Sequence, residues 1–163
     1  MSRLFAGVVA GALAGAAGAT ALSAVSYGDV LLRGRPAGSS AKATVDAAAD
    51  AAGTDVPGDG ETAPNRADAA GQLAGLGVGV GLGAVAGVLR IHHVKIPKAL
   101  SPFALGLGAM ALSDTVMTAL HATDPRSWTT ARLASEALPH LAYGLVATAG
   151  LHRLLDPRTP RAR

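Results

Sequence analysis

Four long apolar stretches alternate with polar segments along the chain. They run approximately over residues 4–27, 72–89, 99–120 and 137–155. About 20 predominantly apolar residues in a helix, at a rise of about 1.5 Å per residue, cover the roughly 30 Å hydrocarbon core of a bilayer. The pattern therefore predicts an all-α fold: an integral membrane four-helix bundle that forms a single domain over residues 1–163.

The four stretches differ in how many charged and polar residues they contain. The second is the most uniform, because no charged residue occurs between Asp68 and Arg90, where a soluble helix would need a polar face. The third and fourth contain polar residues. The first follows Arg3 and is similar to a secretory signal peptide, but its apolar part of about 20 residues exceeds the usual signal core of roughly 7 to 15. We therefore expect a retained anchor rather than a cleaved signal.

A polar segment over residues 33–66 separates the first two stretches. It is acidic and rich in Ala, Gly and Pro, a composition that does not bury enough apolar surface to fold alone. We expect an exposed loop. Within it, Ser39 or Ser40 is a suitable N-cap and Gly53 a suitable end for a short helix over residues 41–52.

Composition also favours lipid as the solvent. Half of the residues are apolar and 15% are charged, against about a quarter charged in soluble domains. The chain has no cysteine, which excludes disulfides, thiolate metal sites and thiol nucleophiles. Basic residues gather at the edges of the apolar stretches rather than on an interleaved polar face. We therefore expect the bilayer as a partner, and no nucleic acid.

The same basic residues predict the orientation, since basic loops resist translocation. Six basic residues are spread over the long loops between stretches one and two and between three and four, where Arg33 and Arg35 argue against the assignment. Eight lie on the other side: Arg3, Arg90, Lys95, Lys98, Arg153, Arg158, Arg161 and Arg163. We expect a plasma-membrane protein with both termini in the cytoplasm.

Two sequence matches occur in the same order in the two halves of the chain. Residues 18–23 read GATALS and residues 108–113 read GAMALS, while residues 81–90 and 144–153 agree at six of ten positions. The matches predict two tandem helical hairpins, which would be parallel repeats with stretches one and three in similar environments. Chance similarity in an Ala- and Gly-rich chain is the alternative.

Glycines recur at every fourth position in the first two stretches. In lipid, such small residues let helices approach closely enough for van der Waals contact. We expect these glycines to pack helix against helix within the chain, with a second copy of the chain as the alternative partner. They are Gly7, Gly11, Gly15, Gly71, Gly75, Gly79, Gly83 and Gly87.

Asp114 is the most informative ionisable residue, because a carboxylate inside a membrane helix requires a partner or a wet cavity. Counting along the helices places His140 at a comparable depth, so a hydrogen bond between the two is plausible. The candidate intramembrane polar site comprises Asp114, His140, Ser113, Thr118, Tyr27 and Asp29. As a functional site it would bind a cation or relay a proton. The alternative is structural, with Asp114 at the surface or bonded to Arg33 or Arg126.

Other chemistry lacks support in the sequence. His92 and His93 have no third ligand at a metal-site spacing, so contact with lipid headgroups is the better interpretation. We expect no metal site, no cofactor and no catalytic residue. Trp128, Tyr27 and Tyr143 fall near the expected membrane interfaces, where amphipathic rings anchor helices.

Several segments carry a family resemblance: GATALSAVSYGDVLLRGRPAGSS, PNR before a glycine-rich stretch, AMALSD, TDPRSW and PHLAYGLV. With them the chain resembles a family of uncharacterised small multi-pass membrane proteins of high-GC bacteria. The resemblance implies a multi-pass plasma-membrane protein and assigns no residue a role. We expect a non-enzymatic structural or accessory bundle that associates with itself or with other membrane proteins. The alternative is a small transporter or channel-like protein that uses Asp114 and His140.

Overall fold

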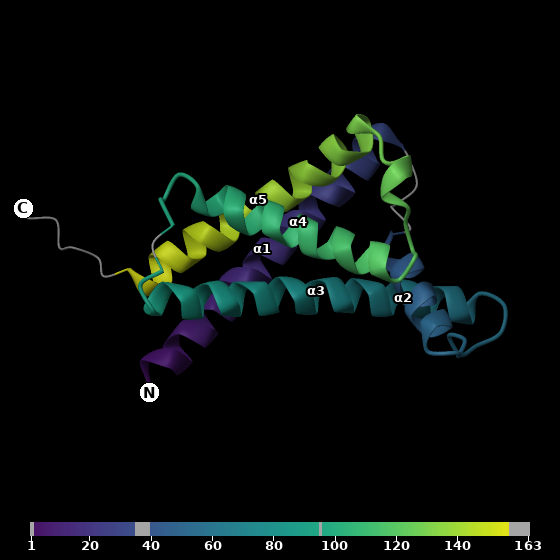
Figure 1. The fold of residues 1–163 in the computed structure, drawn as a ribbon, viewed down its shortest axis with the longest axis horizontal. Helices are drawn as coiled ribbons and strands as arrows, with labels where there is room; N and C mark the ends of the chain where they lie inside the picture. Colours follow the sequence, from purple (N-terminus) through teal and green to yellow (C-terminus); the bar gives the residue numbers. More distant parts are fainter. Residues whose placement is uncertain (1, 35–39, 95, 157–163) are drawn as a thin grey trace, which may run out of the picture.

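The computed structural model describes residues 2–34, 40–94 and 96–156. Within these ranges the fold is entirely helical, as predicted (Figure 1). The elements are α1 (Arg3–Arg33), α2 (Ser40–Ala51), α3 (Thr62–Ile91), α4 (Ser101–Ala119), the short 3-10 helix η1 (Pro125–Ser127) and α5 (Thr130–Leu155).

Three of the helices are longer than the apolar stretches that predicted them. Capping groups set both ends of α1: the Ser2 hydroxyl accepts a hydrogen bond from the Phe5 amide (3.3 Å) at its start, and Gly34, with φ of +62°, ends it. The expected loop over residues 33–66 is therefore partly helical, because α2 and the first turns of α3 lie within it. The hydropathy pattern predicts only the apolar part of each helix and not the polar turns that extend it.

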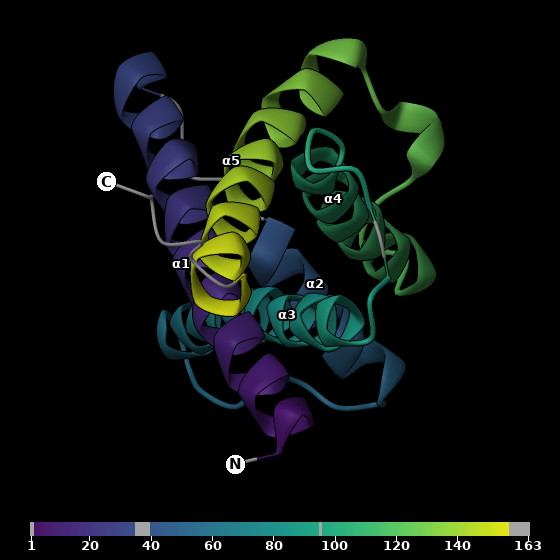
Figure 2. The same ribbon diagram turned by 90° about the vertical axis from the view of Figure 1, so that its left-hand side faces the viewer.

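The long helices are arranged in the order α3, α1, α5, α4. Helix α1 packs extensively on both α3 and α5, and α4 packs on α5, whereas α3 and α4 touch only slightly. Figure 2 shows this arrangement end-on, with α4 beside α5 and away from α1. α1 and α5 are thus the two inner helices, and α3 and α4 are the outer ones, with little contact between them.

Neighbouring long helices are antiparallel. Gly7 lies opposite Gly87 and Gly15 opposite Gly79, so α1 and α3 run in opposite directions. As a result, α1 begins, α3 ends, α4 begins and α5 ends at one end of the bundle (Figure 1). At that end Arg90 of α3 binds Asp156, which follows α5, with a contact of 2.6 Å from Nη2 to Oδ2. The hydrogen bond from Arg90 lowers the pKa of Asp156.

The contact between α1 and α3 is made by backbone against backbone. A Cβ atom built on Gly11 would lie 2.2 Å from the Gly83 carbonyl oxygen, and one built on Gly87 would lie 2.1 Å from the carbonyl oxygen of Gly7. No side chain fits in such a space. Glycine is therefore required for the two helices to approach this closely.

The remaining glycines of the expected stripe have other surroundings. Gly71 faces α2, where an added Cβ would lie 2.5 Å from the Ala41 carbonyl oxygen, and Gly75 has nothing within 4 Å. The four-residue spacing on α3 therefore serves two partners, α2 near its start and α1 near its end.

The two matched halves of the sequence do not have matching environments. Gly18 packs against Tyr143, whereas its counterpart Gly108 has nothing within 4 Å; Gly81 is open, whereas Gly144 would place a Cβ 2.0 Å from the Pro102 carbonyl oxygen. Helix α1 has two extensive neighbours and α4 has one. In two matching hairpins, the contact of α5 with α1 would have its counterpart in a contact of α3 with α4. α5 packs extensively on α1, whereas α3 and α4 touch only slightly. The expectation that stretches one and three share an environment is therefore wrong.

Most of the buried residues are small. Among the described residues, six of the eight buried apolar residues are alanines, and the other two are Leu151 and Tyr143. Tyr143 is 1% exposed, and its hydroxyl donates a hydrogen bond to the Gly79 carbonyl oxygen (2.7 Å). The expectation that Tyr143 is an interfacial anchor is wrong. Gly18 and Gly79 leave room for its ring at the centre of α1, α3 and α5.

Large apolar side chains point outward from every long helix. Examples are Leu13 on α1, Leu73 on α3, Phe103 on α4 and Leu145 on α5, each more than half exposed. By length and composition, α1 and α3 are able to cross a membrane. α4 and α5 do not meet the same criterion.

Candidate functional site

A network of polar side chains occupies the end of the bundle opposite to the Arg90–Asp156 contact. α4 and α5 are joined there by η1, which the Asp124 carboxylate caps by accepting a hydrogen bond from the Arg126 amide (2.9 Å). The Thr129 hydroxyl caps α5 in the same way, from the Arg132 amide (3.2 Å). These caps fix the direction in which the first turns of α5 project their side chains.

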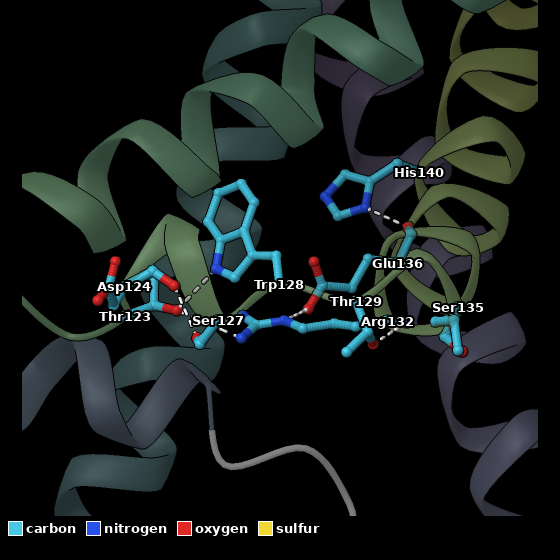
Figure 3. A network of polar contacts seen from close by, with 10 residues as sticks. Thr123, Asp124, Ser127, Trp128, Thr129, Arg132, Ser135, Glu136 and His140 are labelled. Atoms are coloured by element: carbon cyan, nitrogen blue, oxygen red, sulfur yellow. Dashed lines mark hydrogen bonds and ion pairs between the residues drawn. The ribbon is translucent and has the colours of Figure 1, made fainter.

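Arg132 is the centre of the network (Figure 3). Its Nε atom donates to Glu136 Oε1 at 2.9 Å, and its Nη1 atom donates to the Thr123 hydroxyl at 3.3 Å. The guanidinium lies 5.6 Å from the centroid of the Trp128 ring, a cation–π distance, and the indole Nε1 donates to the same Thr123 hydroxyl at 3.0 Å. Arg132 thus ties the loop after α4 to the first turns of α5.

His140 belongs to the same face of α5. Its Nδ1 atom lies 2.7 Å from the Glu136 carbonyl oxygen. Because a carbonyl oxygen only accepts hydrogen bonds, Nδ1 carries the proton. Nε2 is then the nitrogen that is left to accept a hydrogen bond.

Asp114 lies on α4, facing this network. The groups that act on it electrostatically are Glu136, His140 and Arg132. The expected hydrogen bond from His140 to Asp114 does not occur in the described part of the chain. Instead, two further charged residues belong to the candidate site, Arg132 and Glu136. Their side chains are 32% and 29% exposed.

Glycine packing explains why the expected pair is not bonded. A Cβ on Gly106 would lie 2.5 Å from the His140 carbonyl oxygen, so His140 is level with Gly106 on α4. Asp114 is two helical turns further along, a distance of about 12 Å at 1.5 Å per residue. Counting residues along each helix does not reveal the contact between Gly106 and His140, and this contact sets the position of α5 relative to α4.

Asp29, on α1, lies on the other side of α5. Asp29 forms an ion pair with Arg33 (2.6 Å), and the two border a cavity of about 310 Å³ between the end of α1 and the start of α5. That cavity is lined from α5 by Ala131, Ala134, Ser135, Leu138 and Pro139, a different face from that of Arg132, Glu136 and His140. Tyr27 is 53% exposed.

Ser113 and Thr118 are half-buried near Asp114 on α4. Neither makes a side-chain hydrogen bond within the described residues. The six predicted residues therefore do not form one site: Asp114 and His140 belong to the region around Arg132, whereas Asp29 borders the separate cavity.

The sequence contains a signal for the residues that were missed. Arg132, Glu136 and His140 are spaced by four, which places them on one face of a helix. In the sequence, Arg132 is one of the six basic residues of the long loops that predict the orientation, and Trp128 is an expected interfacial anchor. Their cation–π contact requires the turn at η1, which the sequence pattern does not reveal.

The hydrogen bonds to the Thr123 hydroxyl connect the loop after α4 to η1 and α5. The positive charge of Arg132 is matched by Glu136 at hydrogen-bond distance. Within the described residues, no three His, Cys, Asp or Glu side chains are grouped so as to hold a metal ion. The cluster is therefore suited to fixing the loop between α4 and α5.

Comparisons with protein families, with curated proteins and with solved structures found no match to the chain.

Proposed function

We propose that the chain is a multi-pass membrane protein in which α1, α3, α4 and α5 all cross the bilayer, and that it acts as a non-enzymatic structural or accessory bundle. The observation that carries this proposal is the distribution of side chains. Alanine and glycine fill the interior, while leucine, valine and phenylalanine point outward. In water this arrangement would forfeit most of the hydrophobic stabilisation, whereas lipid tails cover such a surface without cost.

The exposure of the two most apolar helices supports the proposal further. Within their most apolar windows, only 28% of α1 and 17% of α3 is buried inside the protein. The core helix of a soluble protein would be largely buried. α4 and α5 do not meet the criterion that α1 and α3 meet. In α5, Arg132 and Glu136 pair with each other, which lowers the cost of placing these two charges in a membrane.

We further propose that both termini are cytoplasmic, from the distribution of basic residues. The chain has no cysteine, so single cysteines introduced at exposed positions report the topology directly. With Asp55→Cys and Ser127→Cys we expect labelling by an impermeant maleimide in intact cells. With Val94→Cys we expect labelling only after permeabilisation. Labelling of Val94→Cys in intact cells would reverse the orientation.

The structural role and the transport alternative make different predictions for reconstituted vesicles. We expect proteoliposomes that carry the full chain to show the same proton and potassium fluxes as vesicles without protein, because Arg132 and Glu136 neutralise each other beside Asp114. A pH-sensitive dye and a potassium gradient measure both. A flux above background that disappears in both Asp114→Asn and His140→Ala would replace the structural role with transport.

A further inference from the structure

A groove opens at the end of the bundle where α3 ends, α4 begins and α5 ends, the end that faces the viewer in Figure 2. Its volume is about 460 Å³. It lies apart from the network around Arg132, which is at the opposite end. The lining residues are Arg90, His93, Val94, Ile96, Pro97, Lys98 and Asp156.

The polar lining of this groove is predominantly cationic. Arg90 and Lys98 carry positive charges, and His93 adds a third basic group. The one carboxylate, Asp156, is already held by Arg90 through Nε (3.1 Å) and Nη2 (2.6 Å). A guanidinium has five N–H donors in all, so Arg90 keeps donors for an additional anion while it holds Asp156 in place.

A buried nitrogen lies among the same charged groups. The Nε2 atom of His152 is buried and has no hydrogen-bond partner within the described residues. Its electrostatic neighbours include Arg90, Asp156 and Lys98. Buried polar atoms without partners are rare in proteins, but His152 does not line the groove, so this atom is not counted among the binding groups of the groove.

The rest of the lining is apolar and exposed. Val94 is 50% exposed and Ile96 is 44% exposed, and Pro97 joins them in the loop between α3 and α4. A free phosphate ion would use only the cationic groups. A phospholipid would use both parts, with its phosphate at the cations and its glycerol and upper acyl carbons against the apolar residues.

We propose that this groove is a binding site for the headgroup of an anionic phospholipid, with Arg90 and Lys98 as the residues that contact the phosphate. The inference rests on the proposed membrane location, which places the loop between α3 and α4 at the surface of the bilayer. Basic pockets between membrane helices at that level are suited to acidic headgroups. The groove would anchor the chain in a leaflet that contains such lipids.

Native mass spectrometry of the full chain in neutral detergent tests the site, with phosphatidylglycerol and phosphatidylcholine as probes. We expect one phosphatidylglycerol to bind per chain in preference to phosphatidylcholine. Lys98→Gln should weaken that binding about fivefold, the effect typical of one basic residue near an anionic surface. The matched control is Arg153→Gln, which removes an exposed charge from the same end but outside the groove, and it should bind like the unaltered chain.

Three results would overturn the proposal. They are equal binding of the two lipids, an equal loss in Arg153→Gln and Lys98→Gln, and displacement of the lipid by millimolar inorganic phosphate, which would make the site one for free phosphate. Alkaline carbonate extraction of membranes from the cells that produce the chain distinguishes a failure of the lipid site from a failure of the proposed membrane location. A chain that stays in the membrane but shows no lipid preference refutes the groove alone.

Discussion

Replacing Gly83 with isoleucine is expected to separate α1 from α3. A Cβ at this position would lie 2.4 Å from the Gly11 carbonyl oxygen and 2.5 Å from Gly15 Cα. Both are backbone atoms of a helix, so no rotation of a side chain relieves the clash. Overpacking a core usually costs about 1–3 kcal/mol, and we expect at least about 3 kcal/mol here because the helices must move apart. The thermal midpoint in detergent should fall by about 10 °C.

Gly81 provides the matched control for this substitution. It is on the same helix two residues away, and nothing lies within 4 Å of the Cβ it would carry. Gly81→Ile makes the same change in volume and hydrophobicity, and we expect its thermal midpoint to stay close to that of the unaltered chain. If Gly81→Ile and Gly83→Ile lost stability equally, the close contact of α1 with α3 would be refuted.

Replacing Tyr143 with alanine is expected to have an effect of similar size. The ring is 1% exposed at the centre of α1, α3 and α5, and truncation of a buried aromatic residue leaves a cavity that costs about 3–5 kcal/mol. The hydrogen bond to the Gly79 carbonyl oxygen (2.7 Å) is lost as well. We expect a fall of about 10 °C or more in the thermal midpoint in detergent.

Two further variants divide this effect into its parts. Tyr143→Phe keeps the ring and removes only the hydrogen bond, which in membrane proteins contributes about 0.6 kcal/mol, so its midpoint should fall by only about 2 °C. Tyr27→Ala truncates the other tyrosine of the chain, which is 53% exposed, and should be nearly neutral. A neutral Tyr143→Ala would refute the buried position of the ring.

The sequence predicted the helical class and the approximate position of each long helix, because long apolar runs carry that information directly. It also predicted that glycines spaced by four mark close helix contacts. It did not predict which helix each glycine meets. Gly71 and Gly83 have the same spacing pattern but face α2 and α1, and that choice depends on how all the helices pack together.

The candidate site was predictable only in part. The sequence identifies Asp114 and His140 as polar residues within apolar stretches. Asp114 lies on α4 and His140 on α5, the helix that packs against it. Their relative depth depends on the contact of Gly106 with His140, which residue counting does not reveal. The role of Arg132 depends on the turn at η1, which brings Thr123 and Trp128 within its reach. Such contacts across a loop have no periodic signature.

The proposed membrane location requires hydrocarbon to be the solvent for the outward-facing leucines, valines and phenylalanines. The most direct measurement is fractionation of cells that produce the full chain, with alkaline carbonate extraction of the membrane pellet. We predict that the chain remains in the pellet after extraction and is released only by detergent. Recovery of a stable, monodisperse chain in the detergent-free high-speed supernatant would contradict the account.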